Sequence, residues 1–396
     1  MSSSGGLGGL GGLGGLGGLG GLGGLGGLGG LGGLASITNP QSFAAVPEAL
    51  VLSCEATTNT GDTDAFGRKH PDVEDPEQME RWEPWVRAQV CLQELLGRIR
   101  MGKSGGGFAL WYCAPAISNF QPKPGATASA TYAPIARLIA PNEEVFGAQV
   151  ARVLDWRELR AERLTEIFAQ IDPQYPFWAS VTCLHPTRTP RTIELIQIAL
   201  QFAVAIEMRI KHALGIWRPF ELNAQVQPVL TTPGHGSFPS GHSTQAYVVA
   251  RLLQSFLWTG KDSGHQSPLD DSHPVTLQLM RQAARIATNR VIAGVHFPVD
   301  SIAGRLLGVA LADHLVAACG AGAGKWIPRT FDGTKITKPG AMVLDLHPEQ
   351  QPLTGGTNAP FYKAHPEVSG VPELPLLEHM WSKAREEWRH FPFNKT

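Results

Sequence analysis

The spacing of hydrophobic residues in the second half of the chain has the period of an α-helix. Within 150–171 the apolar residues recur every three or four positions and form a single stripe: Val153, Leu154, Trp156, Leu159, Leu164, Ile167 and Phe168. The same criterion predicts helices over 81–101, from a cap at Thr192 to about Trp217, and over 241–258, 275–292, 299–318 and 373–389. No alternating run is long enough for a large sheet, so the pattern predicts a mainly α fold built as a helical bundle.

The N-terminal part of the chain follows a different pattern. Residues 5–34 are ten Gly-Gly-Leu repeats, in which ordering the glycines is costly and one leucine per triplet buries little apolar area. We therefore predict a disordered tail over 1–35. Residues 36–147 are expected to form an irregular and helical part packed on the core, with loops and room for a short strand within 103–146. The helical region over 148–396 holds the motifs that carry chemistry, at 211–300.

Composition narrows the classes of protein to which the chain can belong. A formal net charge of -1 gives no basic surface for nucleic acid or for an acidic membrane. No stretch reaches the roughly 18 uncharged apolar residues of a membrane span, because the nearest, 193–206 and 302–319, are interrupted by polar and charged residues. These observations predict a soluble protein with neither a nucleic-acid nor a membrane partner.

The cellular compartment is constrained less strongly. The glycine-rich start lacks the basic and continuous apolar regions of a signal peptide, which favours a cytoplasmic location. The five cysteines leave the compartment open. They are scattered without a CxxC motif, which argues against a disulfide framework or a zinc site: Cys54, Cys91, Cys113, Cys183 and Cys319.

Three short motifs between 211 and 300 carry the candidate chemistry. The first is Lys211-x6-Arg218-Pro219. Its two cations are seven residues apart, about two helical turns, and are predicted to project from one face of a helix. The alternative is a solvated basic edge, which apolar neighbours such as Ile216 and Trp217 disfavour.

The second motif, Pro239-Ser240-Gly241-His242, comes directly before a helical run. Ser240 is the predicted N-cap, Gly241 lets backbone N–H groups approach a ligand, and the helix dipole attracts an anion. The alternative is a simple capping turn. His242 in the first turn argues against that alternative, because an imidazolium there opposes the dipole unless an anion compensates.

The third motif is Arg290-x5-His296-x3-Asp300. Asp300 lies one turn after His296 and can accept a hydrogen bond from one ring nitrogen, which leaves the other nitrogen free for an electrophilic centre. Arg290 is predicted to point toward the same loop, and a core His–Asp pair is the alternative. Together the three motifs supply the groups that hold a tetrahedral or five-coordinate oxyanion and move protons on it.

The order and spacing of these motifs resemble the shared signature of the vanadium-dependent haloperoxidases and the type-2 phosphatidic acid phosphatases. The resemblance covers residues 211–300 and departs from the family pattern at Asn289, where serine is usual. It implies a helical bundle of the vanadium haloperoxidase and acid phosphatase type. Related haloperoxidases associate through helices, so a homo-oligomer is consistent with the resemblance.

For a haloperoxidase, the resemblance implies a vanadate cofactor held by Lys211, Arg218, Ser240, Gly241, Arg290 and His296. His296 would bond the vanadium and Asp300 would orient it, His242 would be the acid–base group, and Lys211 would polarise bound peroxide. Halide would be oxidised to hypohalous acid, which halogenates a small organic substrate. For a phosphatase, the same cage would bind a phosphoryl group, with His296 as nucleophile and His242 as the acid.

Flanking residues favour the haloperoxidase interpretation. The chain lacks the spans of membrane-embedded phosphatases and is longer than the soluble acid phosphatases. His235, seven residues before His242, matches a position that is histidine in bromoperoxidases and commonly phenylalanine in chloroperoxidases. We expect vanadate-dependent oxidation of bromide or iodide by hydrogen peroxide; a soluble acid phosphatase and a non-catalytic oxyanion-binding helical protein are the alternatives. Four aromatic residues are expected to wall the cage: Trp217, Phe220, Phe238 and Phe297.

Overall fold

The computed structural model describes most of the chain outside its N-terminal repeats. The described residues are 45–57, 71–114, 131–171, 174–259, 267–268, 271–320, 324–336, 360–369 and 374–389. The predicted tail at 1–35 lies outside them.

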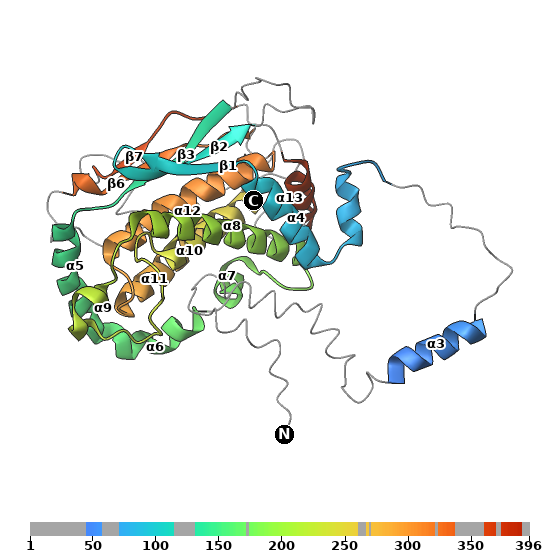
Figure 1. Cartoon of the computed structure of the whole chain (residues 1–396), viewed down its shortest axis with the longest axis horizontal. Helices are drawn as coiled ribbons and strands as arrows, with labels where there is room; N and C mark the ends of the chain where they lie inside the picture. Colours follow the sequence, from blue (N-terminus) through green and yellow to red (C-terminus); the bar gives the residue numbers. More distant parts are fainter. Residues whose placement is uncertain are drawn as a thin grey trace, which may run out of the picture.

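Four long helices form the centre of the molecule, and the fold is mainly α, as predicted (Figure 1). Helix α10 (Gly241–Phe256) packs against the other three: α8 (Pro190–Leu214), α11 (Pro274–Ile292) and α12 (Pro298–Ala318). Because α10 is surrounded in this way, almost all of its residues are buried, polar ones included. Its first turn therefore lies inside the protein, where a polar site can be shielded from water.

Shorter helices cover this centre. Helices α4 (Pro84–Leu96) and α13 (Pro375–Glu387) pack on α8, while α6 (Arg160–Ala169) and α7 (Tyr175–Thr182) pack on α11. The apolar stripe at 150–171 is divided between α5 (Glu143–Asp155), a 3-10 turn at Trp156–Leu159, and α6. Short α9 (Pro219–Leu222) contacts α5.

Both predicted ends of α8 were wrong. Thr189 is the N-cap, and Thr192 lies inside the helix, where its hydroxyl donates to Glu387 of α13 at 2.7 Å. The helix stops at Leu214 because Gly215 adopts a left-handed conformation with φ of 61°, which favours glycine. Arg218 therefore lies beyond the helix, and the prediction that it shares a helix face with Lys211 is incorrect.

A five-stranded sheet occupies part of the region where loops were predicted. Its order is β1-β2-β3-β6-β7, with β3 and β6 parallel and the other neighbours antiparallel. Figure 1 shows the sheet lying over α12 and α8. The pattern missed β2 because its residues are buried on both faces and do not alternate. The strands are β1 (Ile99–Ser104), β2 (Gly107–Ala114), β3 (Thr131–Ile139), β6 (Arg329–Asp332) and β7 (Tyr362–Ala364).

Two further features concern the sequence predictions. Within 36–147, which was expected to be irregular and helical, the structure has α3 (Ala45–Thr57) and a 3-10 helix at Pro76–Arg81. Within the described part of the chain, α12 is long and apolar enough to cross a membrane. Its most apolar 18-residue window is 89% buried, which is the burial expected of a core helix.

Candidate functional site

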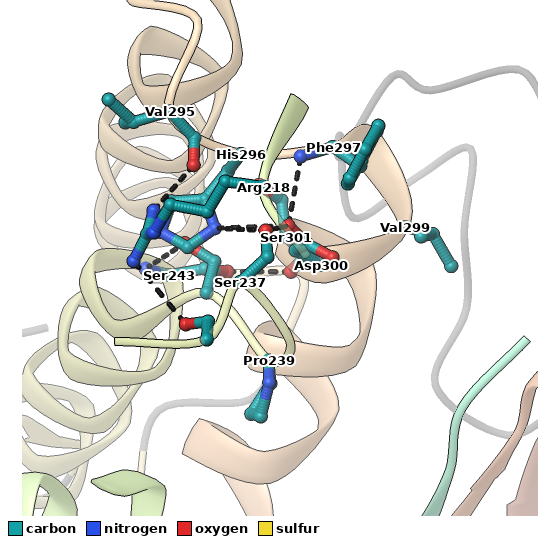
Figure 2. Close-up of polar contacts among 12 residues, drawn as sticks. Arg218, Ser237, Pro239, Ser243, Val295, His296, Phe297, Val299, Asp300 and Ser301 are labelled. Atoms are coloured by element: carbon teal, nitrogen blue, oxygen red, sulfur yellow. Dashed lines mark hydrogen bonds and ion pairs between the residues drawn. The ribbon is translucent and has the colours of Figure 1, made fainter. Parts of the chain in front are cut away.

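The three sequence motifs converge where α10 begins, α11 ends and α12 begins (Figure 2). A cavity of about 140 Å³ lies at this convergence. Its lining combines charged and imidazole groups with an apolar portion: Phe168, Ile171, Glu207, Met208, Arg218, Leu230, Thr231, Pro233, His235, Gly241, His242, Arg290, Val295 and His296. A small buried cavity with several convergent polar groups is a candidate active site.

His296 is held by the carboxylate of Asp300. Oδ2 of Asp300 lies 3.0 Å from His296 Nδ1 and also accepts from the backbone N–H of Phe297 and the hydroxyl of Ser237 (Figure 2). Burial raises the pKa of Asp300 to about 6, so the group is ionised at neutral pH and only accepts. The proton therefore sits on Nδ1. No described residue bonds Nε2, which carries a lone pair on a ring that lines the cavity.

Arg290 carries guanidinium donors that find no partner among the described residues. Nη2 donates to the Ile167 carbonyl at 2.8 Å and to Gln170 Oε1 at 3.3 Å, whereas Nε and Nη1 are buried without an acceptor. Burial lowers the pKa of Arg290 to about 9, which leaves it charged at neutral pH. A buried cation with unpaired donors on a cavity wall is the arrangement that an anion completes.

The residue before Arg290 supports this arrangement. Asn289 donates from Nδ2 to Gln170 Oε1 at 2.9 Å, the same oxygen that Arg290 approaches. Asn289, the residue that departs from the family pattern, therefore helps to hold Gln170 in the position where it accepts from Arg290.

His242 lies in the first turn of α10, and its ring lines the cavity. Nε2 lies 3.2 Å from the carbonyl of Gln170, which can only accept, so the neutral ring carries its proton on Nε2. Nδ1 is then the basic nitrogen. Burial, followed by the charge of Arg290, holds the pKa of His242 well below its ordinary value. His242 is therefore neutral in the anion-free protein, which removes the conflict with the helix dipole.

His235 supplies a third imidazole to the cavity. Its Nδ1 lies 3.1 Å from Nη2 of Arg218, which only donates, and 3.1 Å from the carbonyl oxygen of Gly236, which only accepts. Because the hydrogen bond from the charged guanidinium is the stronger of the two, we place the proton of the neutral ring on Nε2. That N–H is buried and has no acceptor in the described parts of the chain. Burial and the charges of Lys211 and Arg218 lower the pKa of His235 to about 4. The ring is thus a neutral donor at the cavity.

Lys211 lies behind the cavity wall and does not line it. Its Nζ donates to the carbonyls of Gly236 at 3.2 Å, Ser237 at 3.0 Å and Pro239 at 2.5 Å. Burial and the charge of Arg218 lower the pKa of Lys211 to about 7. Three carbonyl acceptors match the three donors of an ammonium, so the contacts favour the charged form, which holds the loop before α10.

Arg218 and Ser240 shape the same loop. Arg218 lines the cavity, yet it donates to the carbonyls of His235 and Gly236 from one side and to that of Val295 from the other. Ser240 is the N-cap of α10, with its hydroxyl accepting from Ser243 N–H at 3.4 Å, and it does not line the cavity. Of the predicted site residues, six therefore reach the wall: Arg218, His235, Gly241, His242, Arg290 and His296.

The expected aromatic wall was wrong. Trp217 is 64% exposed, and Phe238 and Phe297 are fully buried behind the site, where both rings contact Phe146. None of the four predicted aromatic residues lines the cavity. Its apolar side comes from the end of α6 and the residues after it, from α8, from the loop around Leu230 and from Val295 between α11 and α12.

Sequence reasoning also missed Glu207, whose buried carboxyl lines the cavity. Its signal was its position four residues before Lys211, one turn earlier on the same face of α8.

Comparison with known families covers this helical region. No curated protein matches the chain. The family model of the PAP2 superfamily matches residues 195–319, which include most of α8, all of α10, α11 and α12, and every motif residue named above. Residues 195–319 are therefore similar to the PAP2 superfamily, which contains phosphatases and haloperoxidases.

Proposed function

We propose that this protein is a vanadium-dependent haloperoxidase that oxidises bromide or iodide with hydrogen peroxide. The observation that carries the proposal is a cavity with unmet donors on Arg290 and His235, beside a His296 whose Nε2 is free. Cationic and neutral donors without acceptors fit an oxyanion, and a free imidazole nitrogen fits an electrophilic centre at its core. Vanadate has both properties.

The residues that would hold vanadate follow from these free groups. Arg290 and His235 would donate to its oxygens, the N-terminus of α10 at Gly241 would add backbone N–H groups, and His296 would supply the nitrogen ligand. When bound, vanadate would supply the activation of peroxide toward attack by halide. Lys211 and Arg218 would contribute positive charge through the loop that they hold.

Proton movement is assigned to His242. Its Nδ1 is the free basic nitrogen, and an oxyanion bound beside it would raise its pKa, because a nearby negative charge favours the imidazolium. His242 would therefore accept a proton from a hydroxyl or peroxide group in the cavity and return it at a later step. Asp300 keeps the proton of His296 on Nδ1 throughout.

The haloperoxidase is favoured over the phosphatase by His235. Phosphoryl transfer in this cage requires a nucleophile, His296, and an acid, His242. A third neutral imidazole with a free N–H at the cavity has no part in that scheme, whereas it can tune a bound cofactor through a hydrogen bond. The small cavity also suits halide and peroxide, and its apolar side would face a small organic substrate.

The proposal is tested with purified protein freed of bound oxyanions. Bromination of monochlorodimedone would be followed with bromide and peroxide, before and after orthovanadate is added, and hydrolysis of p-nitrophenyl phosphate would be followed in parallel. His296→Ala removes the candidate ligand. His212→Ala changes an exposed histidine one residue after Lys211 and is the matched control.

Vanadate-dependent bromination that is lost in His296→Ala and kept in His212→Ala is the expected result. Phosphate release that vanadate inhibits, without bromination, would instead make the protein a phosphatase with His296 as nucleophile. Oxyanion binding without either activity would leave the non-catalytic alternative.

A further inference from the structure

Glu207 on α8 is a buried acid whose second oxygen is unpaired at the cavity. Glu207 is only 1% exposed to solvent, and it lines the cavity. Oε1 accepts from Nε2 of Gln245 at 2.9 Å. Oε2 has no hydrogen-bond partner within the described ranges, although a carboxyl oxygen buried in this way needs one. A ligand in the cavity is the available partner.

The carboxyl lies at the point where α10 would receive an anion. A β-carbon added at Gly241 would lie 2.7 Å from Oε1 of Glu207 and 3.4 Å from Oε2, so the acid packs directly on the first residue of α10. The glycine makes this approach possible. An acid and the positive end of a helix dipole therefore border the same space.

The charges around Glu207 decide its protonation when an anion is bound. Lys211 lies one turn along α8, and α10 adds His242. Arg218, His235, Arg290 and His296 line the same cavity. Lys211 is held as an ammonium by three carbonyls and makes no hydrogen bond to the carboxyl, so it attracts Glu207 only through space.

Burial raises the pKa of Glu207 to about 7, against the attraction of Lys211. A bound oxyanion would raise this pKa further, because two negative charges in one buried cavity repel each other. An ionised Glu207 would repel a bound anion. A protonated Glu207 has an O–H group at Oε2 that can donate a hydrogen bond to the anion.

We propose that Glu207 is a further oxyanion-binding residue, which is protonated in the ligand complex and donates a hydrogen bond from Oε2 to an oxygen of the bound anion. Above neutral pH, one proton is taken from solvent onto Oε2 for each anion bound, and no covalent bond to the ligand changes. This inference rests on the proposed oxyanion site. It predicts that the anion binds more weakly as the pH rises, because Glu207 must be protonated in the complex.

The test uses molybdate, a tetrahedral oxyanion that does not change its own charge near neutral pH. Binding to the full chain would be measured by calorimetry near pH 8 in two buffers of different ionisation enthalpy, which yields the number of protons taken up. The expected uptake approaches one proton per anion. The dissociation constant should weaken by roughly 30-fold between about pH 6 and pH 8.5, because each pH unit above the pKa of the acid weakens binding tenfold.

Glu207→Gln identifies the group that takes up the proton. The amide keeps a donor in place of the protonated acid, so binding at pH 6 should stay within a few-fold of the unaltered protein while proton uptake disappears. An infrared difference spectrum of molybdate binding should gain a protonated-carboxyl band in the unaltered protein and lack it in Glu207→Gln. Glu158→Gln, at an exposed glutamate, is the control and should keep both signals.

The outcomes separate this inference from the proposed function. Molybdate binding without proton uptake, or with uptake that persists in Glu207→Gln, would overturn the role of Glu207 and leave the oxyanion site intact. Persistent uptake would point to His242, whose pKa a bound anion raises, or to the fraction of Lys211 that is neutral near pH 8. If the variant does not fold, the infrared spectrum of the unaltered protein still tests the inference, because binding without a new protonated-carboxyl band would overturn it. Failure of both molybdate and orthovanadate to bind would overturn the oxyanion site and the inference together.

Discussion

Nδ1 of His296 lies 3.0 Å from Oδ2 of Asp300, and that one oxygen also receives the Phe297 N–H and the Ser237 hydroxyl. Three donors on one carboxylate oxygen fix the ring and the loop that carries it. Because the ring proton is committed to Asp300, the chemistry of His296 is confined to Nε2. The negative charge of Asp300 also makes that nitrogen a stronger base.

Replacing Asp300 by asparagine should separate the effect of its negative charge on His296 from the effect of its hydrogen bonds. The amide oxygen can keep all three hydrogen bonds, but the charge that strengthens His296 is lost. We expect orthovanadate affinity to fall by roughly 10- to 100-fold, the range for partners of metal-bound histidines. Titration calorimetry measures the affinity. Ser237→Ala, which keeps the carboxylate and removes one donor, should lose less, and equal losses in the two variants would contradict the assigned role.

Arg290 should contribute to binding while it reduces the stability of the anion-free protein. Replacing it by methionine removes a buried cation whose Nε and Nη1 have no acceptor in the described residues. The free energy of unfolding without ligand is expected to stay level or rise by up to about 2 kcal/mol. The rise in melting temperature on adding orthovanadate should vanish.

Two results would contradict this account of Arg290. One is a large loss of stability without ligand, which would make the arginine a structural residue. The other is a preserved ligand-induced shift. Arg285→Gln on the same helix, where a partly exposed arginine pairs with Glu166 at 2.7 Å, is the control and should keep the shift.

The core helices and the site motifs could be predicted from the sequence because both are encoded by residues that are close together in the chain. Long amphipathic segments and residues at fixed spacing are local patterns, so α10, α11 and α12 were placed within two residues of their observed ends. The sheet was missed because β6 pairs with β3 from about 190 residues further along the chain, and β7 extends the sheet by pairing with β6. No local pattern encodes the pairing of β3 with β6.

The composition of the cavity wall was harder to predict than its motifs. Lys211 was expected to hold and polarise a ligand, and the sequence did not indicate that its ammonium donates to three loop carbonyls. Trp217 was expected to cover the site, but the turn at Gly215 directs the chain so that this ring is exposed. Glu207 was overlooked because a single carboxylate inside an apolar helix has no motif of its own.

His314 on α12 should lower stability in a pH-dependent way. It is buried among the rings of Tyr112, Phe202 and Trp326, and neither ring nitrogen has a partner among the described residues. Burial lowers its pKa to about 3, from an ordinary value of 6.5. Between these two values the unfolded chain binds the additional proton, so this group makes stability fall as pH falls below about 6.5.

His314→Phe should therefore stabilise the protein, and more so in acid. Removing two unpaired polar atoms is worth about 1–3 kcal/mol at neutral pH. The advantage should increase by roughly 2 kcal/mol at pH 5, from 1.36 kcal/mol per pH unit of difference from the unfolded pKa. Urea unfolding at pH 7.5 and pH 5 measures both values. An advantage that does not change with pH would contradict the assignment, and His212→Leu, at an exposed histidine, should show no such change.

Gly304 and Gly308 set the distance between α12 and α10, and through it the position of Ser240. A β-carbon at Gly304 would lie 2.6 Å from the carbonyl of Ser240, and one at Gly308 would overlap the carbonyl of Thr244. Both obstacles are backbone atoms, so the helices must separate. We expect Gly308→Ala to reduce the free energy of unfolding by about 1–3 kcal/mol. Gly304→Ala should in addition weaken orthovanadate binding, because it displaces the cap of α10.

Gly147 provides the matched control for these two substitutions. It lies in α5, and a β-carbon there would meet nothing within 4 Å. Gly147→Ala should therefore stabilise the protein by about 0.5–1 kcal/mol, the difference in helix propensity between the two residues. Chemical unfolding and calorimetric titration of the three variants test the idea. If Gly304→Ala and Gly308→Ala behaved like Gly147→Ala, close packing of α12 on α10 would not be what holds Ser240 in place.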